Sequence, residues 1–73
     1  MMTDDERKKL ENNFTYHAPK GDQPQRYNHI QQRAHYLAHD VMEMCPDSRE
    51  RSLAITKLEE AVFWANASIA RHE

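Results

Sequence analysis

The chain has 73 residues, one cysteine, one glycine and a formal net charge of −2. A chain this short forms one domain at most and buries only about 60% of its unfolded surface, so its stability is marginal without a partner. One cysteine excludes an intramolecular disulfide and a Cys-x-x-Cys metal site, and one glycine excludes a glycine-rich phosphate loop. The acidic balance argues against duplex nucleic acid as a partner, because such binding favours strongly basic surfaces.

Targeting and membrane segments are not expected. Residues 1–11 are polar and charged, unlike the apolar region of a secretory signal peptide. No apolar run approaches the roughly 20 residues that span a bilayer, and a lone thiol suits a reducing compartment. We therefore expect a soluble protein of the cytoplasm that does not contact a membrane.

The chain is expected to begin with a short polar helix within residues 1–11. Thr3 and Glu6 have the spacing of a capping box, which predicts a helix from residue 4 to about residue 11. Asparagine, proline and glycine cluster in residues 12–24, which predicts a loop.

The predicted loop contains two aromatic residues, Phe14 and Tyr16, although exposed loops favour polar side chains. Either the rings pack the loop onto the rest of the chain, or they bind something else. Aromatic rings stack on nucleobases, and cations pair with phosphates. The residues that supply both properties in and just after the loop are Tyr16, His17, Lys20, Arg26 and Tyr27.

A long helix is predicted over residues 25–45. Asp22 followed by Gln25 is typical of a helix N-terminus, and Pro46 ends the helix because the residue before proline avoids the α conformation. Apolar residues recur three and four positions apart, which is the spacing of one helical stripe. This stripe consists of Tyr27, Ile30, Ala34, Leu37, Val41 and Met44.

A second long helix is predicted over residues 47–72, capped by Asp47 with Glu50 in the capping-box position. Its main apolar stripe consists of Ile55, Leu58, Val62, Ala65 and Ile69. A second apolar set lies off that stripe and consists of Leu53, Phe63, Trp64 and Ala67. The helix is therefore apolar over more of its circumference than one partner helix covers.

The short connection around Pro46 makes the two long helices antiparallel neighbours. The predicted fold is a single all-α domain over residues 1–73: an antiparallel two-helix hairpin with a short N-terminal helix and a loop. Exposed apolar patches usually mark interfaces, so the surplus surface of the second helix predicts a symmetric homo-oligomer.

The sequence favours binding over catalysis. His35 and His39 share a helix face, but they supply only two of the four ligands of a closed metal site, so we interpret them as a solvated polar face. Cys45 lies at a helix C-terminus, where the dipole disfavours a thiolate, and we expect it to be a small buried hydrophobe. We expect no catalytic residues, no metal and no cofactor.

Two segments resemble a known family. The run from Ser48 to Arg71 resembles the second helix of small phage proteins that carry the helical-hairpin domain shared by anti-CBASS and anti-Thoeris sponges. The segment from Phe14 to Tyr27 resembles the loop that precedes the hairpin in the same proteins, and the likeness covers about residues 12–72. It implies a hexamer of hairpins that sequesters cyclic oligonucleotide or ADP-ribose-derived immune signals without hydrolysing them.

The resemblance also implies ligand contacts. Tyr16 matches the aromatic residue that stacks on a base in the anti-CBASS sponges, and Arg71 matches a further contact near the end of the second helix. The family's basic residue early in the first helix is replaced here by Gln31, with Arg33 two residues on. With the loop residues, the predicted ligand-binding set is Tyr16, His17, Lys20, Arg26, Gln31, Arg33 and Arg71.

Two other functions remain open at this point. A protein-interaction module would use the apolar face around Phe63 and Trp64, and would bind no nucleotide. A small nucleic-acid-binding regulator is disfavoured by the acidic balance and by the absence of a basic recognition helix.

Overall fold

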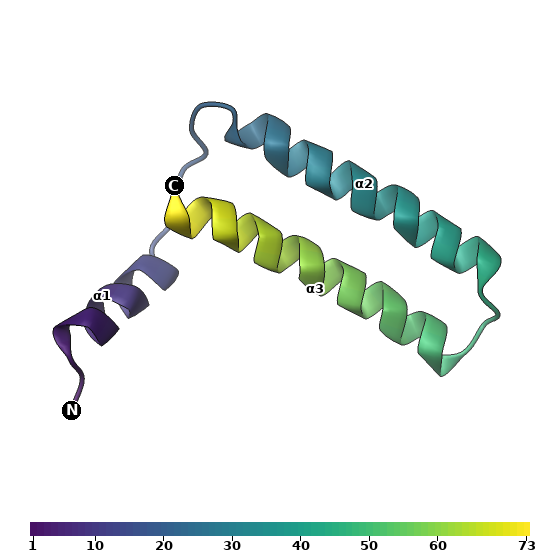
Figure 1. The fold of residues 1–73 in the computed structure, drawn as a ribbon, viewed down its shortest axis with the longest axis horizontal. Coiled ribbons are helices and arrows are strands. Elements are labelled where there is room, and N and C mark those ends of the chain that lie inside the picture. Colours follow the sequence, from purple (N-terminus) through teal and green to yellow (C-terminus); the bar gives the residue numbers. More distant parts are fainter.

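The computed structural model describes all 73 residues and consists of three helices without a strand (Figure 1). Helix α1 spans Asp4–Asn13, α2 spans Gln23–Met44 and α3 spans Arg49–His72. Helices α2 and α3 lie side by side as an antiparallel hairpin, and α1 projects from its open end, where α2 begins and α3 finishes (Figure 1). The all-α prediction and the predicted hairpin are confirmed.

The capping box predicted for α1 is present. The Thr3 hydroxyl accepts from the Glu6 backbone N–H at 3.1 Å, and the Thr3 backbone N–H donates to the Glu6 carboxylate at 2.9 Å. Hydrogen bonds with the backbone and side chain of Thr3 favour the ionised form and lower the pKa of Glu6. The helix continues to Asn13 instead of ending near residue 11.

The caps predicted for the two long helices are wrong in detail. Ser48, not Asp47, caps α3: its hydroxyl accepts from the Arg51 backbone N–H at 3.1 Å, while the Asp47 carboxylate pairs with the Arg51 guanidinium. Asp22 occupies the N-cap position of α2 but makes no capping hydrogen bond. Helix α2 begins at Gln23, earlier than predicted, because proline is tolerated in the first turn.

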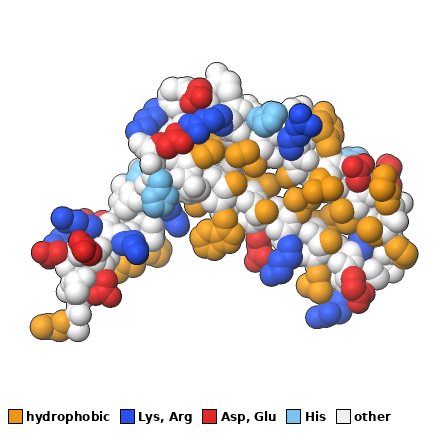
Figure 2. Space-filling model, viewed as in Figure 1, with side chains coloured by type: hydrophobic (Ala, Val, Ile, Leu, Met, Phe, Trp, Pro, Cys, Tyr) orange, Lys and Arg blue, Asp and Glu red, His pale blue; other side chains and the backbone are white.

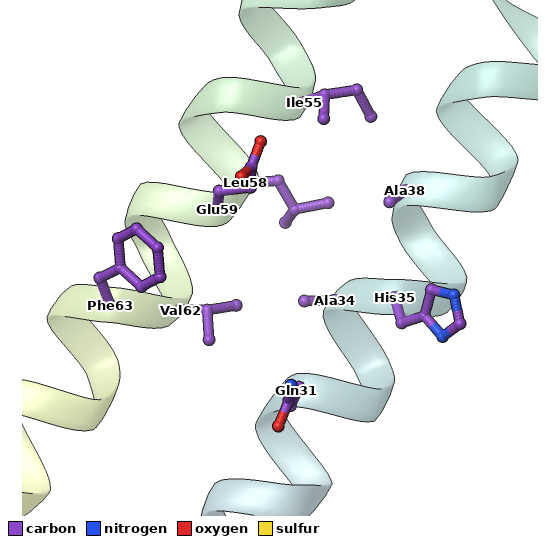
Figure 3. Close-up of a pocket in the computed structure, with 9 residues that line it drawn as sticks. All are labelled: Gln31, Ala34, His35, Ala38, Ile55, Leu58, Glu59, Val62 and Phe63. Atoms are coloured by element: carbon purple, nitrogen blue, oxygen red, sulfur yellow. The ribbon is translucent and has the colours of Figure 1, made fainter.

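The hairpin encloses a groove rather than a closed core. Ile55, Leu58 and Val62 point from α3 toward α2, where the facing side chains are Ala34 and Ala38 (Figure 3). Because alanine is too short to fill the space between the helices, a groove of about 290 Å³ remains open. No apolar side chain is fully buried in the chain.

The chain is also extended for its length. Its radius of gyration is 16.3 Å, compared with about 11 Å for a compact domain of this size. Its accessible surface is 6186 Å², compared with ~4,700 Å² for a compact monomer of 8.7 kDa. Apolar side chains gather between and beside α2 and α3 on the face shown in Figure 2. The large exposed side chains of the hairpin include Leu37, Met42, Leu53, Phe63 and Trp64.

The expectation that Cys45 is buried is wrong: the side chain is exposed. The hairpin turns next to it, and α1 lies at the opposite end of the hairpin (Figure 1). None of the helices is long and apolar enough to cross a membrane.

Candidate ligand-binding site

The end of α1, the following loop and the last turn of α3 meet at the open end of the hairpin. We call residues 14–22 the aromatic loop. Asn12 Nδ2 donates to the Arg71 carbonyl at 2.9 Å, and the Asn12 carbonyl contacts His17 Nε2 at 2.9 Å. Since a carbonyl oxygen only accepts, His17 donates through Nε2. These bonds hold the aromatic loop beside α3.

Two adjoining concavities open at this corner, with volumes of about 430 and 350 Å³. Both are lined by Tyr16, His17, Ala70 and Arg71. We call them together the aromatic-loop site. The first also reaches Tyr27 and Asn66, and the second reaches Lys20, Gln23 and Glu73. The site therefore combines residues from the loop and from both long helices.

The aromatic rings of the loop do not pack against their own chain. Phe14 is 86% exposed and Tyr16 is 83% exposed, so the interpretation that they fasten the loop to the hairpin is wrong for a single chain. Only Tyr16 of the two lines the aromatic-loop site. Its ring is thus available for stacking against a flat ligand or for contact with another copy.

The cations of the site differ in availability. Arg71 makes no ion pair, and its guanidinium has only a 3.5 Å contact with the Asn13 carbonyl. Arg26, in contrast, is held by two carboxylates, those of Glu73 and Asp22. A guanidinium without a carboxylate partner is suited to binding a phosphate, so Arg71 is the arginine best placed to do so.

The ion pair of Arg26 with Glu73 shifts both groups. The side-chain hydrogen bond from Arg26, followed by that from Gln23, lowers the pKa of Glu73 to about 2. The same hydrogen bond raises the pKa of Arg26 above its ordinary value. Lys20 Nζ also donates to the Glu73 main-chain oxygen at 2.6 Å. The Arg26 guanidinium is therefore already paired within the chain.

Two of the predicted ligand-binding residues lie elsewhere. Gln31 lines the groove between α2 and α3 (Figure 3), and Arg33 is exposed on α2. Both lie roughly two turns into α2, which carries them away from the open end. Tyr16, His17, Lys20 and Arg71 are the predicted residues that the structure brings together, with Arg26 beside them.

Sequence reasoning missed the polar residues that organise this corner. Gln23 is the only buried residue of the chain, and Glu73 receives hydrogen bonds from three side chains. Asn66 Oδ1 is buried without a hydrogen-bond partner. Asn66 lies at helical spacing from Val62 and Ile69, so a polar residue within that apolar stripe was a usable signal.

The hairpin and its open end define a class of small helical proteins with an aromatic and cationic surface at one end. No group of three or more His, Cys, Asp or Glu side chains in the chain could hold a metal ion.

A family model described as "Acb2/Tad1, hairpin domain" matches residues 6–70. The protein therefore belongs to this family, that of the phage anti-CBASS and anti-Thoeris sponge proteins. The resemblance seen in the sequence is confirmed. Comparisons with curated proteins and with solved structures gave no match.

Proposed function

We propose that the protein sequesters cyclic oligonucleotide or related nucleotide defence signals in the host cytoplasm, and that it binds them without hydrolysis. Family membership supports the anti-defence role. The observation that carries the proposal is the exposed Tyr16 ring on the same site as the Arg71 guanidinium, which lacks an ion pair. This pairing suits a ligand that combines a base with a phosphate.

The geometry of the site supports a specific set of proposed contacts. Tyr16 stacks on a base, and Arg71 binds a phosphate with Lys20 close by on the same site. His17 donates to Asn12 through Nε2, which leaves its other ring nitrogen for the ligand. Gln31 and Arg33 lie away from this corner. We therefore propose that they contact only a ligand bound at the site of a neighbouring copy.

We also propose that the protein works as a homo-oligomer, and the family resemblance suggests a hexamer. The chain exposes about 1,500 Å² more surface than a compact monomer would, which matches the scale of a substantial interface. Each concavity is at the small end of the ~300–1,000 Å³ range of ligand pockets. A second copy would cover the apolar surface and enclose the ligand.

Titration calorimetry with a panel of cyclic di- and trinucleotides tests the binding proposal. Light scattering on the same sample measures the mass of the assembly, and circular dichroism confirms that it is helical. We expect at least one nucleotide to bind to a protein that is folded and oligomeric. No binding to any member of the panel by such a sample would refute the proposal.

A protein-interaction module is the second candidate, because Phe63 and Trp64 are 66% and 67% exposed. The sponge proposal places these rings between copies, so Trp64→Glu should lower the measured mass of the assembly. An interaction module predicts a monomer or dimer in the wild type, with an unchanged mass in the variant and no nucleotide binding.

A further inference from the structure

We propose that Arg26 is a positioning residue rather than a ligand contact. With Gln23 and Glu73 it forms a lock that fastens the start of α2 and the aromatic loop to the end of α3. The lock thereby sets the placement of Tyr16 relative to Arg71. This inference rests on the proposed function and concerns how the proposed site is held.

The lock consists of several hydrogen bonds that converge on one carboxylate. Arg26 Nη1 donates to Glu73 Oε2 at 2.7 Å, and Nη2 contacts Oε1, so the pair is bidentate. Gln23 Nε2 donates to the same Oε1 at 3.2 Å. Bidentate arginine–carboxylate pairs fix orientation as well as distance. Acidic and basic side chains lie next to one another over the start of α2 (Figure 2).

Gln23 joins the two sides of the lock. Its side-chain oxygen accepts from the Lys20 backbone N–H at 3.1 Å, while its own backbone N–H donates to the Lys20 carbonyl at 3.0 Å. It is only 4% exposed, and a buried amide that loses a partner is destabilising. The Gln23 amide therefore links the Glu73 carboxylate to the aromatic loop through a hydrogen bond at each end. Glu73 lies beyond residue 70, where the family match ends.

The charges around Arg26 distinguish a positioning role from direct phosphate binding by this residue. In the lock, the charge of the Arg26 guanidinium is offset by the carboxylates of Asp22 and Glu73. An incoming phosphate would gain little attraction there unless it displaced Glu73. The two roles therefore predict opposite results when the Glu73 carboxylate is removed.

Glu73→Ala tests the inference, with cyclic GMP–AMP as the probe in titration calorimetry. A positioning role predicts that affinity falls, by about twofold to fivefold for a half-exposed ion pair. A phosphate site that Glu73 occupies predicts that affinity rises. Glu60→Ala is the matched control, because it removes a carboxylate from an exposed ion pair with Lys57 elsewhere on α3, and it should leave affinity unchanged.

The charge-swapped double variant Arg26→Glu with Glu73→Arg supplies the second arm. Positioning predicts that the reversed pair restores affinity toward the wild-type value, whereas a direct phosphate contact by Arg26 predicts no restoration. Unchanged or tighter binding by Glu73→Ala, or failure of the swap to restore binding, would overturn the inference.

Hydrogen exchange at the Lys20 backbone N–H gives a readout that needs no ligand. Loss of the lock in Glu73→Ala should speed this exchange, since Gln23 protects that N–H group. If the wild type binds no cyclic nucleotide, the proposed function fails while this measurement still tests the lock. Unchanged exchange at Lys20 would refute it.

Discussion

Replacing Tyr16 with alanine removes the exposed aromatic ring of the aromatic-loop site. The ring is 83% exposed, so its loss should leave helicity and assembly mass unchanged. Stacking of one base on an aromatic ring is worth about 1–3 kcal/mol, which corresponds to a rise in Kd of about 5-fold to 140-fold. Titration calorimetry of the wild type and the variant against the same cyclic nucleotide measures this change.

Phe14→Ala is the matched control for this prediction. Phe14 is 86% exposed and lies in the same loop, but it lines neither concavity. We expect its replacement to leave Kd unchanged and Tyr16→Phe to retain most of the affinity, because the ring remains. An unchanged Kd in Tyr16→Ala, or an equal loss in Phe14→Ala, would refute the stacking role.

Three further results are expected. Arg71→Ala should weaken binding and reduce its dependence on salt; calorimetry at two ionic strengths measures both effects. Ser48→Ala should lower the free energy of unfolding by about 1 kcal/mol, as expected for a lost N-cap. Asp47→Ala should lower it by less, and urea denaturation measures both variants. The Glu73 carboxyl should titrate by nuclear magnetic resonance with a pKa of about 2. The ionised Glu73 carboxylate therefore contributes its full stabilisation above its ordinary pKa of 4.5, and this stabilisation is lost as the pH falls through about 2. A measured pKa near 4.5 would contradict the ion pair.

The helices of this fold were predictable because they depend on local signals. Apolar spacing of three and four residues located both long helices, and Pro46 located the turn between them. The capping box at Thr3 is likewise a local pattern, and the structure contains it. The α3 cap was missed because Asp47 and Ser48 are adjacent and both are good N-cap residues.

The arrangement of the open end depends on contacts between distant residues. Residue types indicated that Tyr16, His17 and Lys20 form a site, but the sequence does not show that Glu73 pairs with Arg26 across the hairpin. That contact depends on the relative lengths of α2 and α3, which bring the end of one beside the start of the other (Figure 1). Exposure of Cys45 was missed for a similar reason, because burial depends on what packs over the tip.

Recovery of intact ligand tests the central claim most directly. The protein is incubated with the cyclic nucleotide that it binds in calorimetry and passed through a filter that retains it. The retained protein is then denatured by heat, and the released nucleotide is identified by chromatography. A sponge depletes the nucleotide from the filtrate and releases it unchanged. Nucleotide that stays in the filtrate of a folded protein, or that is released as a linear product, would contradict binding without hydrolysis.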